Sequence, residues 1–182
     1  MEIDDSGTTD GGHTDAVSMD VAPPLSDAFP TPTDGSPGQC NNIDPGTKTI
    51  SINQIGQNPP PFGSTGTPPL TPGLYELADL TLYTGPNGPT GSGGTAAGEL
   101  RVNIANSADY IFQVASVTNN EAPTHSNSTG MNAGPGAIFI SQICPDSQPG
   151  VNVAYIANAS SFTLRIQGSG VTADESFQLI GP

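Results

Sequence analysis

Residues 99–104 read ELRVNI, and this stretch decides the fold class of the chain. Its apolar residues, Leu100, Val102 and Ile104, fall at every second position, and charged or amide residues fall between them. A period of two places the apolar side chains on one face of an extended strand and the polar ones on the other. The stretch therefore predicts a half-buried antiparallel strand whose three apolar side chains face a core.

Seven other stretches have the same β-type composition, rich in Val, Ile, Leu, Tyr and Phe, and turn residues separate them. No stretch of the chain shows the apolar spacing of three and four that a long helix requires. The chain is therefore predicted to be all-β with eight strands. The seven further strands are expected at residues 48–55, 74–83, 110–114, 137–144, 151–155, 162–166 and 177–179.

The stretch 74–83 contains a change of phase. Tyr75 and Leu77 are separated from Leu80 and Leu82 by an odd number of residues, so a regular strand would place the two pairs on opposite faces. One extra residue near Ala78 would bring all four to the same face. The pattern predicts a β-bulge there and a curved sheet.

Three segments rich in Gly, Pro, Asn and Ser are expected to be long surface loops: residues 57–72, 85–98 and 121–136. Eight short strands in sequence favour an up-and-down antiparallel meander. An open sheet of that size would leave two unpaired edges, so closure into an eight-stranded barrel is the favoured prediction. The alternative is a two-sheet β-sandwich, in which the first and last strands lie in separate sheets.

The chain divides at Cys40. Residues 1–39 hold eight acidic residues and no Lys or Arg, and they have too little apolar surface to offset the entropy of ordering. They are expected to form a disordered acidic tether, and residues 40–182 to form one β-domain. With only Lys48, Arg101 and Arg165 against seventeen acidic residues, the chain would repel nucleic acid and anionic lipid surfaces.

The two cysteines, Cys40 and Cys144, are expected to form one disulfide, which points to a secreted or outer-surface location outside the cytoplasm. The alternative is two independent buried thiols. They do not form a CxxC pair, so redox catalysis and zinc binding are not expected. No apolar stretch reaches the length of a transmembrane helix.

Two parts of the sequence pattern resemble known protein families. The segment 72–77, PGLYEL, resembles the first-strand signature of lipocalin-like barrels, with Tyr75 where those proteins usually carry Trp. The acidic leader, this strand, the QICP element at 142–145 and the FTL strand at 162–164 together resemble acidic-stalked bacterial surface lipoproteins of unknown function. That resemblance implies a lipid anchor on a cysteine whose place Met1 takes, and it supplies no catalytic residues.

Little in the sequence indicates catalysis. The two histidines, His13 and His125, lie in separate segments and cannot complete a triad or a zinc cluster. Four carboxylates lie on or beside predicted strands, where two of them could converge for acid and base work, but nothing in their spacing indicates that they do. We therefore expect no enzyme activity and no cofactor. The four carboxylates are Glu76, Asp79, Glu99 and Asp109.

The large apolar and aromatic side chains of the strands could either fill the interior of a narrow barrel or line a ligand cavity at its mouth. The predicted function is a non-enzymatic binding module whose partner is a small apolar ligand or a protein. The alternative is a structural or adhesive β-sandwich that acts through protein contacts. The candidate cavity residues are Tyr75, Leu77, Tyr110, Phe112, Tyr155 and Phe162.

Overall fold

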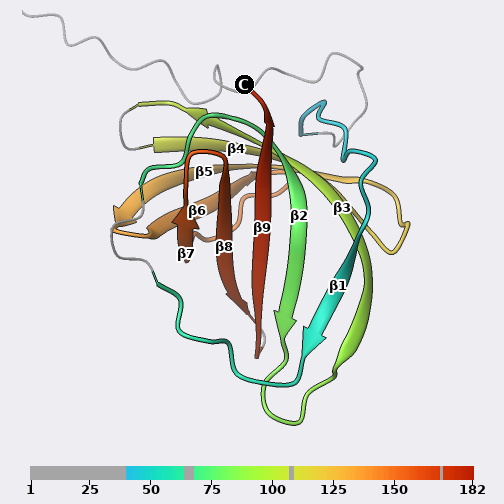
Figure 1. Cartoon of the computed structure of the whole chain (residues 1–182). Helices are drawn as coiled ribbons and strands as arrows, with labels where there is room; N and C mark the ends of the chain where they lie inside the picture. The colour runs from blue at the N-terminus through green and yellow to red at the C-terminus, as the bar shows by residue number, and fades with distance from the viewer. Residues whose placement is uncertain (1–39, 64–67, 107–108, 169) are drawn as a thin grey trace, which may run out of the picture.

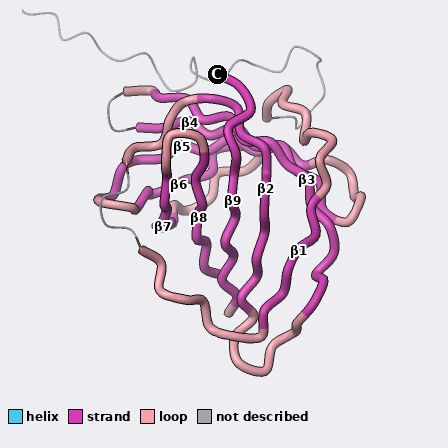
Figure 2. The backbone as a smooth tube through the Cα atoms, viewed as in Figure 1, coloured by secondary structure: helices cyan, strands magenta, loops and turns pink. Residues whose placement is uncertain are grey.

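The computed structural model describes residues 40–63, 68–106, 109–168 and 170–182. The predicted tether 1–39, with His13 and Met1, lies outside the described residues. The described chain contains strands and loops and no helix (Figure 2). The nine strands are β1 (Ile50–Ile55), β2 (Gly73–Tyr83), β3 (Gly91–Ile104), β4 (Asp109–Thr118), β5 (Thr124–Gly134), β6 (Ala137–Cys144), β7 (Val151–Ala157), β8 (Ser161–Gly168) and β9 (Val171–Gly181).

All nine strands belong to one hydrogen-bonded sheet, which confirms the all-β prediction. From β2 to β9 each strand pairs antiparallel with the next, and β2 also pairs with β9 along most of its length. These eight strands therefore form a closed ring. The two-sheet sandwich is not the architecture of the described chain, because its strands lie in a single sheet.

The first strand departs from the predicted meander. β1 lies between the lower parts of β2 and β3, where those two strands separate (Figure 1). It runs parallel to β2, with Ile52 opposite Leu80, and antiparallel to β3, with Ile50 opposite Ala96. The expected pairing of the first strand with the last is therefore wrong, and β2 is the strand that pairs with β9. We call β1 the wedge strand.

Two of the predicted loops contain strand residues. β5 occupies most of 121–136, and β3 begins at Gly91, within the predicted loop 85–98. The strand β5 lacks apolar alternation because small residues suit its inner face: a Cβ on Gly130 would collide with the ring of Phe112. Gly93 is similarly crowded, since its Cβ would lie 2.9 Å from Nε2 of Gln54 in β1. The third segment, 57–72, has no strand in its described part.

The predicted bulge is present. The register between β2 and β9 shifts between Leu77 and Asp79, which leaves Ala78 as the extra residue. As a result Leu80 and Leu82 pack against the same core as Tyr75 and Leu77. The bulge thus keeps one apolar face along the whole of β2.

The prediction that Ile104 faces the core is wrong. Leu100 and Val102 are buried at 2% and 0% exposure, but Ile104 is 46% exposed. Ile104 is the last residue of β3 and pairs with Tyr110 at the turn into β4. The strand extends beyond the core at this point, so Ile104 keeps the alternating pattern of apolar residues but is not buried.

The segment that follows Cys40 crosses the outer face of the ring. The disulfide between Cys40 and Cys144 at the end of β6 is present, as predicted. Next to it, the fully buried Asn41 donates from Nδ2 to the carbonyls of Val114 in β4 and Ser126 in β5, at 3.1 and 2.9 Å. These bonds satisfy buried polar groups and fix the segment against β4 and β5.

The outer face on the opposite side holds another cross-connection. Arg165 in β8 is 7% exposed and forms a bidentate ion pair with Asp174 in β9, at 2.7 and 2.6 Å. Its Nη1 donates to the carbonyl of Pro60, and its guanidinium lies 4.3 Å from the centroid of the Phe62 ring. The side chain therefore ties the loop after β1 to the ring.

Candidate functional site

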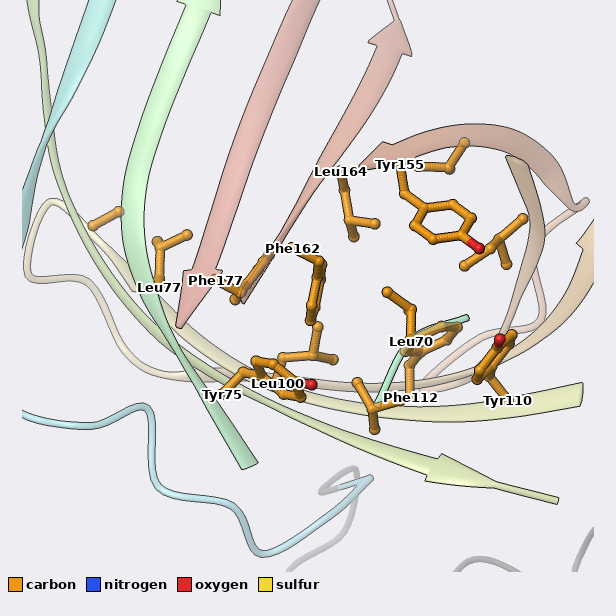
Figure 3. Close-up of a cluster of buried hydrophobic side chains, with 14 of the residues drawn as sticks. Leu70, Tyr75, Leu77, Leu100, Tyr110, Phe112, Tyr155, Phe162, Leu164 and Phe177 are labelled. Carbon is orange, nitrogen blue, oxygen red and sulfur yellow. The ribbon is translucent and has the colours of Figure 1, made fainter. Parts of the chain in front are cut away.

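The interior of the ring has a tightly packed part. The ring of Phe162 lies 4.8 Å from that of Tyr75 in an edge arrangement and 5.1 Å from that of Phe177 in a stacked one. Leu70, from the loop before β2, points into this cluster and is 1% exposed (Figure 3). Its burial shows that the loop 57–72 does not lie wholly on the surface.

The six candidate cavity residues all lie in this packed cluster, with exposures between 1% and 6%. Tyr110 also borders a small hollow of about 110 Å³ near Met131 and Phe139. The six side chains come from β2, β4, β7 and β8, so the ring brings together residues up to about ninety positions apart in the chain. They are Tyr75, Leu77, Tyr110, Phe112, Tyr155 and Phe162.

The inner face continues below this cluster, and some of its apolar side chains are partly exposed there. The lower ends of β2, β8 and β9 reach below β4 to β6 in Figure 1. On these lower ends Leu80, Leu82 and Ile166 touch the core but remain partly exposed. Ala173 of β9 lies between Leu82 and Ile166 in the pairing register and is also partly exposed. We call this surface the open inner face.

Glu175 is the charged residue of the open inner face. It lies opposite Leu80 of β2 on one side and Leu164 of β8 on the other, both of which face the core. Its side chain is partly buried among these residues and keeps access to solvent. This burial raises the pKa of the Glu175 carboxyl above its ordinary value, because desolvation disfavours the charged form.

No described residue neutralises Glu175. Within the described ranges its carboxylate has no hydrogen bond or ion pair. The three basic side chains of the chain lie elsewhere: Lys48 pairs with Glu76, Arg165 pairs with Asp174, and Arg101 is exposed on the other face of β3. The carboxylate oxygens still reach solvent, but the apolar side chains beside them make the charged form less favourable than it would be on an open surface.

Substituting Glu175 by Gln should make stability less dependent on pH. A raised pKa means that the folded state binds the proton more readily than the unfolded state. The protonated carboxyl therefore makes its full contribution to the free energy of unfolding below the ordinary pKa of 4.5. This contribution is lost as the pH rises toward the raised pKa. We expect Glu175→Gln to raise stability at pH 7 by about 1 kcal/mol, or about 2–4 °C in Tm, with little change at pH 4.

Thermal unfolding at pH 4 and pH 7 checks this expectation. The control is Asp79→Asn, which removes one negative charge from the exposed outer face of β2. The inner faces of β2 and β8, the strands beside β9, carry no other carboxylate, and Tyr75 is their one titratable residue. Equal gains for Glu175→Gln at both pH values would contradict the assignment.

The outer face brings two of the four candidate carboxylates together. Glu76 in β2 lies directly opposite Glu99 in β3, and Lys48 lies 3.2 Å from Glu76. Burial, followed by the negative charges of Asp44 and Glu76, raises the pKa of Glu99, while Arg101 lowers it. Glu99 lines an open groove of about 380 Å³ together with Arg101, Gln113 and Asn42–Asp44. Sequence spacing alone missed this cross-strand pair.

The remaining candidates for chemistry lie apart. Asp79 accepts a hydrogen bond from Thr81 on the outer face, and Asp109 contacts Asn106 at the turn before β4. The ring of His125 lies on the outer face with Nδ1 3.2 Å from Oδ1 of Asn41. In the described part of the chain, no three His, Cys, Asp or Glu residues are grouped so as to hold a metal ion.

Comparisons with protein-family models, curated proteins and solved structures find no match to this chain. In the described ranges, no helix is long and apolar enough to cross a membrane. The site must therefore be interpreted from its own geometry. That geometry offers an apolar inner face with one carboxylate and, on the outside, a shallow polar groove.

Glu175 is the residue of the site that sequence analysis missed. The predicted last strand covered only 177–179, whereas β9 begins at Val171. Continuing the alternation of Leu179 and Phe177 backwards places Glu175 and Ala173 on the same inner face. The sequence therefore contained this pattern. It was missed because a carboxylate at an inward position is more typical of the end of a strand than of its middle.

Proposed function

We propose that the protein is a non-enzymatic binding module whose eight-strand ring, β2 to β9, is an up-and-down barrel of the lipocalin-like type that takes a small apolar ligand. The observation that carries this proposal is the open inner face. There Leu80 and Leu82 of β2 and Ile166 of β8 face the core and stay partly exposed. Ligand sites in proteins are lined predominantly by apolar side chains, and these residues would supply such a lining on the inside of the ring.

A location outside the cytoplasm belongs to the same proposal. The disulfide between Cys40 and Cys144 is weakly compatible with an oxidising compartment. A domain held at a surface by an acidic tether and a lipid anchor, as in the surface lipoproteins that the sequence resembles, would present its ring to the surrounding medium. In such a molecule the membrane is contacted by the anchor alone.

A binding function also accounts for the outer face better than catalysis does. Lys48 already neutralises Glu76, and His125 takes part in the contacts of the buried Asn41. These groups stabilise the crossing segment and the wedge strand. A protein partner acting on the outer surface remains the alternative, and its sign would be binding that survives when the open inner face is filled.

The test is to fill the open inner face and measure binding of a neutral apolar dye, N-phenyl-1-naphthylamine, by fluorescence. Ala173→Trp places a large ring between Leu82 and Ile166. Ile180→Trp is the matched control, because Ile180 lies on the same strand and is 49% exposed. We expect the wild type and Ile180→Trp to bind the dye, and Ala173→Trp to bind it at least about tenfold more weakly.

Absence of dye binding by the wild type would reject the proposal. Equal binding by wild type and Ala173→Trp would place the site elsewhere and reject the open inner face. Thermal unfolding of each variant without dye shows whether a loss of binding reflects a loss of folding.

A further inference from the structure

The interior of the ring carries a negative charge that the described chain does not balance. The register between β8, β9 and β2 fixes Glu175 on the open inner face, between Leu80 and Leu164. Every Lys and Arg of the sequence lies among the described residues and is accounted for outside this face. No described side chain balances this charge, and the carboxylate oxygens remain open to solvent, so a proton, water or a cation from outside the described chain can reach them.

The surroundings decide which kind of cation fits. Ca²⁺ and Mg²⁺ require several oxygen ligands, and the residues paired with Glu175 on either side are leucines. An organic ammonium group requires one strong acceptor for its N–H groups, and its hydrocarbon part gains from contact with apolar side chains. The open inner face offers this combination of one carboxylate with Leu80, Leu82, Ile166 and Ala173 around it.

We propose that the open inner face binds a ligand with an apolar body and a protonated amine, and that the Glu175 carboxylate is the counter-ion of the amine. This inference rests on the proposed function and names the class of ligand that the same site takes. Ion pairing in surroundings of low polarity is strong when both charges are otherwise unpaired. The raised pKa of Glu175 agrees with such a role, because binding an ammonium group would restore the ionised form.

The same geometry excludes the acidic relatives of such a ligand. A fatty acid placed on the open inner face would set its carboxylate against that of Glu175 and against a chain with a net charge of −14. Ligands with the same hydrocarbon chain should therefore bind in the order ammonium, alcohol, carboxylate. This order separates the inference from general apolar binding, which ranks ligands by hydrocarbon area alone.

The experiment uses decylammonium, decanol and decanoate at pH 7 in about 0.15 M salt, which screens exposed charges beyond about 8 Å. Their affinities are measured by displacement of N-phenyl-1-naphthylamine. For the wild type we expect decylammonium to bind at least about tenfold more tightly than decanoate. For Glu175→Gln we expect decylammonium to lose about tenfold in affinity while decanol is unchanged.

Asp79→Asn is the matched control. It removes the same charge from the outer face of the neighbouring strand, so it should leave the order of the three ligands intact. If decanol displaces the dye but decylammonium has no advantage, or if Glu175→Gln retains that advantage, the inference is overturned and the proposed function stands. If neither the dye nor any decyl compound binds, both fail.

Discussion

Replacing both Cys40 and Cys144 by alanine is expected to lower the free energy of unfolding by about 4–5 kcal/mol. The two residues are 104 positions apart, so the bond closes a loop that includes most of the ring. In the chain-entropy account, a crosslink of this span removes much of the freedom of the unfolded chain. A loss of this size is comparable to the whole stability of many domains.

Urea unfolding of the wild type and the double variant measures this difference. Wild type in the presence of a reductant is the matched control, and its midpoint should approach that of the double variant. The m-value should rise in both, because an unfolded chain without the crosslink exposes more surface. A loss below about 1 kcal/mol would show that the bonds of Asn41 alone hold the crossing segment in place.

The second large effect is expected from Phe162→Ala, which should cost about 3–5 kcal/mol. Phe162 is 3% exposed and its ring contacts those of Tyr75 and Phe177, so truncation removes two ring contacts and leaves a void in the packed part of the interior. The surrounding strands belong to a closed ring and can move only a little to fill the void.

Phe62→Ala is the matched control for this substitution. Phe62 is partly exposed, and its ring contacts the guanidinium of Arg165 on the outer face. Its loss should cost about 1 kcal/mol. The losses in free energy of unfolding, measured by denaturant unfolding, should therefore differ several-fold between the two variants. Equal losses would contradict the division between a packed interior and an outer loop contact.

Sequence periodicity was sufficient for the strands that have one buried face. Leu100 and Val102, and the pair Phe162 and Leu164, alternate with polar residues and are buried as expected. The bulge at Ala78 could also be predicted, because a change of phase in an otherwise apolar strand has few other solutions. These features depend on neighbours along the chain, which the sequence displays directly.

The features that escaped prediction depend on neighbours across the ring. β5 forms because β4 and β6 pair with it on both sides, although its own residues, including Gly130, read as a loop. The wedge strand pairs parallel with β2 only because β2 and β3 separate at their lower ends. Glu175 became visible as part of a site only when β9 was found to extend back to Val171.

The position of the disulfide also determines how the domain carries a mechanical load. A pull on the chain from the N-terminal side arrives at Cys40 and passes through the sulfur atoms to Cys144 at the end of β6. The chain between residue 41 and the wedge strand then bears no tension. The force enters a strand that lies between two neighbours in the ring, and β1, which is held by short pairings, stays slack.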